Sequence, residues 1–171
     1  MKAQDESDFA SYFAARRDHV RRTAFLLCGD WHKADDLTQV AFVKLYGAWE
    51  RIRERAALDA YVRACLVRTS IDESRRPWRR ERTVEILPES ADTAAADIAS
   101  MVVEREAVEK ALAVVPPGQR AVLVLRYFEG LDVAQTASTL RCSEGNVKSQ
   151  TARGLTAMRA AMTSQAGGTA A

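Results

Sequence analysis

The sequence has no apolar run long enough to span a bilayer, and its first residues, Met1 to Glu6, do not resemble a signal peptide. Hydrophobic residues make up 47% of the 171 residues, which is enough for the core of one ordinary domain or of two small ones. We therefore expect a cytoplasmic protein that does not enter a membrane.

Cysteine and histidine are also scarce. Cys28, Cys65 and Cys142 are widely spaced and form no C-x-x-C pair, and only His19 and His32 could complete a metal site. The cysteines are best explained as small buried apolar residues. The sequence predicts no metal and no other cofactor.

Two further patterns are missing. No segment alternates apolar and polar residues for long enough to predict a β-strand, and no internal repeat is present. There are no paired carboxylates beside a base, no nucleophile with a histidine and no glycine-rich phosphate loop. The sequence predicts an all-α fold and a protein that is not an enzyme.

Apolar residues recur at helical spacing along most of the chain, which predicts a series of helices with one buried face each. Their predicted buried positions are Phe9, Phe13, Val20, Ala24 and Leu27; Leu37, Ala41, Leu45 and Ala48; Leu58, Val62, Cys65, Leu66 and Thr69; Val108, Leu112 and Val115; Val133, Ala137 and Leu140; and Val147, Thr151, Leu155, Met158 and Met162.

Turn and capping residues predict where several helices begin and end. A first helix from Asp8 should end at Gly29, and Asp35 and Asp36 lie where the next should begin, because a helix N-terminus favours negative charge. Pro77 should end the third helix. We expect one further helix over residues 119–128, stopped by a glycine.

The net charge of +2 hides an uneven distribution. Between residues 81 and 104 six acidic residues face a single base, Arg82, so both flanking regions are net positive. We expect two small helical domains, residues 1–82 and 105–163, held apart by a flexible acidic linker over residues 83–104. Residues 164–171 are small and uncharged in their side chains, and we expect a flexible tail there.

Residues 131–162 predict two short helices that meet at a tight corner. Asp132 with Gln135 has the spacing of a capping box, Ser143 can cap the second helix, and three residues from Arg141 to Ser143 are too few for a side-by-side hairpin. Polar residues point outward from the second helix; they are Glu144, Asn146, Lys148, Ser149, Gln150 and Arg153. Such a helix can read a DNA major groove, although a solvated polar face has the same pattern.

A second basic region follows the third predicted helix. Arg75, Arg76, Arg79 and Arg80 surround Trp78. Arginines grip phosphates and a tryptophan stacks on an unpaired base, as in proteins that bind single-stranded nucleic acid. Cations are also favoured at any helix C-terminus, so the cluster alone leaves both interpretations open.

With these features in place, the chain resembles the extracytoplasmic-function (ECF) sigma factors, two-domain subunits of bacterial transcription initiation. Residues 114–131 are close to the pattern of the family's domain 4, and Val147-Lys148-Ser149 matches its recognition helix. In the first domain, residues 34–42 resemble the helix that binds core polymerase. Ile71-Asp72 with Arg75-Arg76 resembles the end of the promoter-opening segment.

The resemblance implies a function and a set of site residues. The chain would bind core RNA polymerase through the β′ clamp and the β flap, recognise promoter DNA at its −35 and −10 elements, and promote strand opening. The residues it implies are Asp35, Asp36 and Gln39 for the polymerase; Tyr61, Arg68, Arg75, Arg76 and Trp78 for the −10 element; and Arg126, Asn146, Lys148, Ser149, Gln150 and Arg153 for the −35 element.

Some positions depart from the family's pattern. Val40 stands where a glutamate is common, and Tyr61, Ala64 and Arg68 replace a common tryptophan, arginine and asparagine near the −10 strand. The −10 base preference therefore cannot be transferred to this chain. An anti-sigma factor is a further candidate partner.

Two other functions compete with this interpretation. A helix-turn-helix repressor would explain residues 131–162 but not the first domain, and a helical adaptor would bind only proteins, without the steep salt dependence of DNA binding. The final residues, Ala170 and Ala171, resemble the endings of degradation tags that a ClpX-type protease reads. A frayed terminus without function is the favoured explanation of these two residues.

Overall fold

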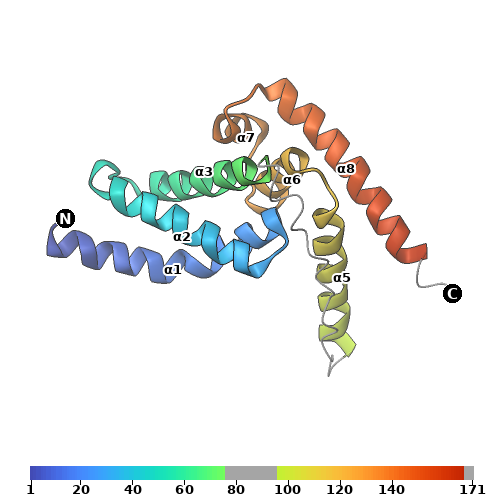
Figure 1. Ribbon diagram of the computed structural model, residues 1–171, viewed down its shortest axis with the longest axis horizontal. Helices are drawn as coiled ribbons and strands as arrows, with labels where there is room; N and C mark the ends of the chain where they lie inside the picture. The colour runs from blue at the N-terminus through green and yellow to red at the C-terminus, as the bar shows by residue number, and fades with distance from the viewer. Residues whose placement is uncertain (76–95, 168–171) are drawn as a thin grey trace.

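The computed structural model describes residues 1–75 and 96–167, with side chains for 1–75 and 104–167. Within these ranges every regular element is a helix, as the sequence predicts (Figure 1). The order is α1 Ala3–Cys28, α2 Trp31–Ala48, η1 Trp49–Arg51, α3 Arg55–Ser74, α5 Ala96–Ala113, α6 Pro117–Leu123, η2 Val124–Phe128, α7 Val133–Leu140 and α8 Glu144–Gly167.

The first lobe, α1 to α3, is a three-helix bundle. Gly29 ends α1 in a left-handed conformation with φ 74°, as predicted, and the Asp30 carboxylate accepts hydrogen bonds from the His32 and Lys33 backbone amides. Helix α2 thus begins at Trp31, and the prediction that it begins at Asp35 and Asp36 is wrong. The cap directly after the glycine starts the helix a full turn earlier, which leaves both aspartates on an exposed face.

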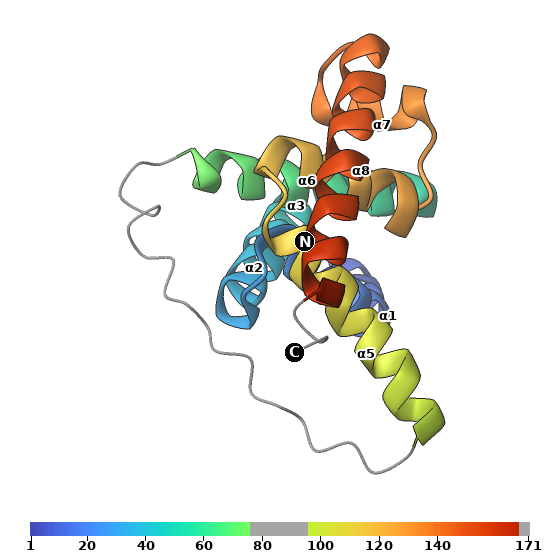
Figure 2. The same ribbon diagram turned by 90° about the vertical axis from the view of Figure 1, so that its right-hand side faces the viewer.

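The second lobe, α5 to α8, contains the predicted helix-turn-helix. Asp132 and Gln135 form the capping box, and the Ser143 hydroxyl accepts a hydrogen bond from the Asn146 amide at 3.0 Å. Arg141 turns the chain between α7 and α8 with φ 55°. Helix α8 lies against α5, α6 and α7 (Figure 2). A small core of Val122, Ala137 and Val147 joins α6, α7 and α8.

The helix predicted over residues 119–128 is not regular. After α6 the chain widens into the π-helical turn η2, in which the Glu129 amide donates to the Val124 carbonyl at 3.0 Å. Periodicity cannot detect one extra residue in a turn.

Most predicted core positions are buried or partly buried, but two are exposed. Val108 is 40% exposed and Met162 is 41% exposed, although both lie on the predicted stripes. They border an open apolar groove between α5, η2 and α8, because these helices diverge there and no other helix of residues 1–75 and 96–167 covers them.

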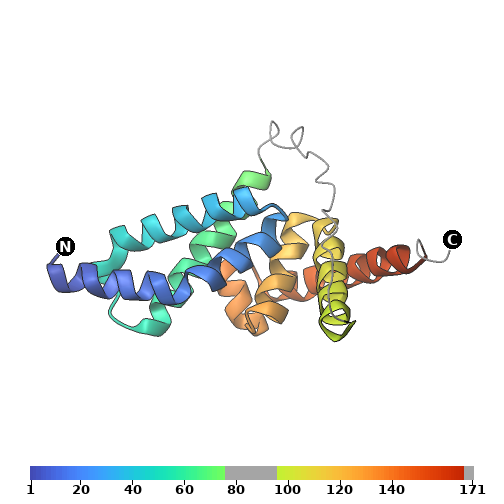
Figure 3. The ribbon, with the colours of Figure 1, turned by 90° about the horizontal axis from the view of Figure 1, so that it is seen from below.

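Helix α8 continues to Gly167, past residue 164 where the sequence predicts a flexible tail. Ala166, with Ala160 and Ala161 earlier in α8, favours a helix, and the Gln165 side-chain amide donates to the Ala107 carbonyl of α5 at 3.4 Å. The start of α1 and the end of α8 lie at opposite ends of the molecule (Figure 3). Ala170, Ala171, Arg76, Trp78 and most of the acidic linker lie outside the described residues.

The two lobes are not held apart. One continuous core contains Leu27 and Leu66 of the first lobe together with Leu112, Leu123 and Leu125 of the second. The expectation of separated lobes is therefore wrong for this structure. The acidic charge of the linker could not reveal that apolar residues on both sides of it share a core.

Helix α8 approaches α6 closely at Gly154. A Cβ atom built there would lie 3.0 Å from Cγ and Cδ1 of Leu123, which is itself 4% exposed. We expect Gly154→Ala to lower the free energy of unfolding by about 1 kcal/mol, because overpacking outweighs the gain in helix propensity. Urea denaturation measures this change. The matched control is Gly47→Ala in α2, where nothing lies within 4 Å and the same substitution should stabilise the protein.

Candidate nucleic-acid and polymerase interfaces

The exposed face of α8 gathers most of the residues predicted to read DNA. Asn146, Lys148, Ser149 and Arg153 are exposed, whereas Val147 and Thr151 on the opposite face are buried. The buried face fixes the helix on the lobe, so the polar side chains point outward together. A helix of this kind, entered through a tight turn, has the geometry that reads a major groove.

Two residues that were predicted to contact DNA are less exposed than the others. Arg126 is half-buried, and its Nη1 donates to Thr151 Oγ1 at 3.2 Å, so it contacts the buried face of α8. Gln150 is also half-buried, and its side-chain oxygen is buried without a hydrogen-bond partner. Arg126 therefore helps to hold α8 in place, and Gln150 is less accessible than its neighbours on the exposed face of α8.

The residues predicted for the −10 element lie along α3. The Tyr61 hydroxyl donates to the Lys44 carbonyl at 3.4 Å, and desolvation raises the pKa of its phenol. Arg68 Nε donates to the Thr139 carbonyl of α7 at 3.1 Å, and Arg75 is exposed at the end of the helix. Arg76 and Trp78 cannot be placed, because they lie outside the described residues.

Asp35, Asp36 and Gln39 are exposed on α2, as a protein-binding surface requires. Arg21 of α1 donates to Asp35, and this hydrogen bond lowers the pKa of the Asp35 carboxyl, which is therefore ionised at neutral pH. The Arg21 guanidinium also lies 4.4 Å from the ring centre of Trp31.

An apolar stripe that was not predicted from the sequence lies beside these residues. Val40, Val43 and Tyr46 are 36%, 63% and 45% exposed, and the last two line a groove of about 700 Å³ between α1 and α2, together with Gln39. Exposed apolar residues in one row mark an interaction surface. The signal was present, because these residues lie on the polar side of the Leu37, Ala41 and Leu45 stripe.

Buried polar residues join the lobes, and the sequence analysis missed these as well. Arg120 is 9% exposed; its Nη1 donates to the Leu27 carbonyl of α1 at 3.0 Å, and its Nη2 donates to the Ala113 and Val115 carbonyls at 2.6 and 3.1 Å. Burial lowers the pKa of its guanidinium. Such contacts join residues far apart in sequence and leave no local pattern.

Cys28, Cys65 and Cys142 all lie in the described part of the chain. All three are free, and no group of three or more metal-ligating side chains is found within residues 1–75 and 104–167. Burial raises the pKa of the Cys28 thiol to about 11, and its sulfur donates to the Asp30 carbonyl. Cys28 is thus a packed thiol rather than a reactive one. No helix in the described part of the chain is long and apolar enough to cross a membrane.

Comparison with known proteins gives two family matches. Residues 12–80 match sigma-70 region 2, and residues 105–158 match sigma-70 region 4. The RNA polymerase sigma-E factor of Streptomyces avermitilis is 34% identical over 154 residues, which cover 89% of this chain and 83% of the relative. The ECF RNA polymerase sigma factor SigM of Mycobacterium tuberculosis is 29% identical over 151 residues, or 88% of this chain and 75% of the relative.

A solved structure supports the fold. The sigma factor RpoE of Bartonella quintana, in complex with the anti-sigma factor NepR, is 21% identical and matches with a TM-score of 0.69 over 91% of this chain and 97% of that chain. Sigma factors are regulatory proteins without catalysis of their own, which agrees with the absence of a catalytic pattern in the sequence. The chain belongs to the sigma-70 family, as an extracytoplasmic-function sigma factor that acts in transcription initiation and promoter recognition.

Proposed function

We propose that the exposed face of α8 reads the −35 element as duplex DNA, and this face is the observation that carries the assignment. Asn146, Lys148, Ser149 and Arg153 supply donors and acceptors for base edges and phosphates. Gln150 adds its amide nitrogen at the edge of this face. Arg126 holds Thr151 and adds a positive charge toward the backbone of the DNA.

The proposed −10 surface is the side of α3 with Tyr61, Arg68 and Arg75. Arg76 and Trp78, which follow α3 in the sequence and lie outside the described residues, belong to the same proposal. The basic side chains of these residues suit phosphates, and their rings suit an unstacked base. Binding of the separated strand would stabilise the open promoter without ATP.

The proposed contact with the β′ clamp is the exposed face of α2. Asp35, Asp36 and Gln39 provide its polar part, and Val40, Val43 and Tyr46 provide an apolar centre. An apolar centre with a charged rim is the usual composition of a specific protein interface.

The proposed contact with the β flap is the groove between α5, η2 and α8, which has a volume of about 600 Å³. Its exposed apolar residues, Val108, Tyr127, Phe128 and Met162, suit an apolar partner segment. An anti-sigma factor is a second proposed partner, because the RpoE structure contains one. This assignment places the protein in the cytoplasm, where the polymerase works.

Lys148→Ala and Arg153→Ala test the −35 assignment. We expect each variant to weaken binding to a −35 duplex; a lost base contact should cost about 1–3 kcal/mol and relax specificity, whereas a lost phosphate contact should weaken all sequences alike and reduce the salt slope by about 1. Fluorescence anisotropy at several salt concentrations distinguishes the two outcomes. The control is Lys110→Ala, an exposed lysine on α5. Unchanged binding in both variants would show that a different face of α8 meets DNA.

A further inference from the structure

Helix α7 ends in a left-handed turn, and the residue in that turn is an arginine. Arg141 follows Leu140, the last residue of α7, and has φ 55° and ψ 47°. The Arg141 amide donates to the Ser138 carbonyl at 3.3 Å, and the Cys142 amide donates to the Ala137 carbonyl at 3.0 Å. These two hydrogen bonds form a Schellman motif, whose left-handed position is usually glycine because a Cβ atom is strained there.

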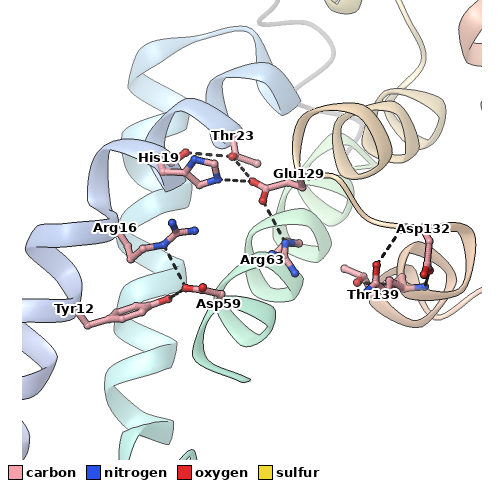
Figure 4. Close-up of polar contacts among 10 residues, drawn as sticks. Tyr12, Arg16, His19, Thr23, Asp59, Arg63, Glu129, Asp132 and Thr139 are labelled. Carbon is pink, nitrogen blue, oxygen red and sulfur yellow. Dashed lines mark hydrogen bonds and ion pairs between the residues drawn. The ribbon is translucent and has the colours of Figure 1, made fainter. Parts of the chain in front are cut away.

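Glycine takes the other two left-handed positions among the described residues. Gly29 ends α1 with φ 74°, and Gly130 lies two residues after η2 with φ 72°. The other end of α7 also has the usual residue for its place, because the Asp132 carboxylate accepts a hydrogen bond from the Gln135 amide at 2.7 Å (Figure 4). The arginine in the corner of the helix-turn-helix is therefore an exception within this chain.

The Arg141 side chain does not offset this strain with a contact of its own. It is exposed, and within the described residues its guanidinium has no hydrogen bond, ion pair or ring contact. An arginine here lowers the stability of the isolated chain relative to glycine. Backbone strain of this kind persists at sites where it serves a function.

Arg141 lies at the end of α8 that carries the proposed −35 residues. It precedes Glu144, the first residue of α8, by three positions, and Lys148 lies within the first turn and a half of that helix. Positive charge dominates this unit: between residues 133 and 167 the basic residues are Arg141, Lys148, Arg153 and Arg159, and the only acidic residue is Glu144. The surroundings of Arg141 therefore favour an anion.

The place of Arg141 outside the helix indicates which part of the DNA it meets. A helix with its side chains is about 10–12 Å wide and fills a major groove about 12 Å wide, so the residues of α8 face the base edges. A long side chain beyond the end of the helix reaches the wall of the groove, which the phosphates form. We propose that Arg141 binds a backbone phosphate of the −35 duplex, and that this contact explains an arginine where the turn favours glycine. The inference rests on the proposed assignment of α8 to the −35 element.

Arg141→Gly and Arg141→Asn should have opposite effects on folding and on binding, because both remove the charge and both suit a left-handed turn. The midpoint of thermal unfolding should rise by about 2–4 °C in the glycine variant, and by less in the asparagine variant. Binding of the full chain to duplex DNA should weaken by about eightfold at about 0.1 M salt, and its salt slope should fall by about 0.9, as for one lost phosphate contact. Circular dichroism and fluorescence anisotropy measure the two effects.

Two DNA probes distinguish a phosphate contact from a base contact. One is a set of 20-base-pair duplexes that the parent chain selects from a random pool, and the other is the unselected pool. A phosphate contact carries no sequence information, so both probes should lose affinity by the same factor.

Two control variants separate the local contact from general charge. Arg141→Lys keeps both the charge and the strain, so it should melt as the parent does and bind DNA within about twofold of it. Arg105→Asn removes the same charge from α5 beside the far end of α8, where Ala107 contacts Gln165, about 28 Å along the helix from Asn146. This variant should also bind within about twofold of the parent, because salt screens a charge at that distance.

Several outcomes would overturn the proposal. One is binding by Arg141→Asn that is as tight as that of the parent or of Arg105→Asn. Another is a lower melting midpoint in both uncharged variants, because Arg141 would then hold the fold, and a third is a larger loss on the selected duplexes, because Arg141 would then contact a base. If the parent selects no sequence, the −35 assignment fails instead, and the unselected pool still decides whether Arg141 binds phosphate.

Discussion

Replacing Arg120 with methionine should lower the free energy of unfolding by about 3 kcal/mol, the largest effect on stability that we expect from one substitution. Methionine keeps an apolar stem but removes the donors to the Leu27, Ala113 and Val115 carbonyls. The Leu27 and Ala113 carbonyls lie at the ends of α1 and α5, and Val115 follows α5; each carbonyl would lose its charged hydrogen-bond donor. Urea denaturation followed by circular dichroism measures the change.

Two comparisons identify the cause. Arg120→Lys should recover little of the stability, since a compact ammonium cannot reach three carbonyls as a planar guanidinium does. Arg105→Met, on the exposed side of α5, should change the free energy of unfolding by no more than about 0.5 kcal/mol. Equal effects of the methionine at both positions would contradict the role assigned to Arg120.

The second large effect is expected at Val43. Val43→Glu should weaken binding to core RNA polymerase by about 30-fold or more, or at least about 2 kcal/mol, because it places an unpaired charge in the apolar centre of the proposed clamp contact. Val43 is 63% exposed, so the isolated chain should fold and melt as the parent does. Titration of a fluorescently labelled chain with core polymerase gives the dissociation constant.

The matched control for Val43 is Ala15→Glu. Ala15 is exposed on α1, outside the groove between α1 and α2, and it gains the same charge. This variant should bind polymerase as the parent does. Normal binding by Val43→Glu would move the clamp contact away from the apolar stripe of α2.

Local signals in the sequence predicted most of the fold. The capping box at Asp132 and the cap at Ser143 are confirmed, because a cap involves residues within three positions of each other. The second helix was placed too late, because Asp35 and Asp36 suit a helix start by charge, whereas Asp30 starts it by hydrogen bonding. Local charge is a weaker indicator than a cap that follows a glycine.

Long-range contacts could not be predicted in this way. Glu129 meets His19 and Thr23 across more than 100 residues, and Arg120 meets Leu27 across 93. No periodicity or spacing in one sequence relates such positions. For the same reason the shared core of the lobes was not predicted, although the buried positions that α1, α2, α3 and α5 contribute to it were largely predicted.

The same difference between local signals and long-range contacts applies to the candidate site. The sequence predicts which side chains of α8 are exposed, because the apolar positions Val147 and Thr151 define its buried face. The exposed residues are Asn146, Lys148, Ser149 and Arg153. The hydrogen bond of Arg68 to α7 depends on how the lobes meet, and the phase of α3 carries no information about it.

The π-helical turn of Val124–Phe128 has a consequence for how this lobe can vary. One surplus residue in a turn advances every later residue by about 100° around the axis. Deleting one residue there would restore a regular helix and swing the following segment, with Glu129 at its start, away from α1. Loss or gain of one codon in this turn would therefore rotate the helix-turn-helix of α7 and α8 relative to α1 without changing any of its side chains.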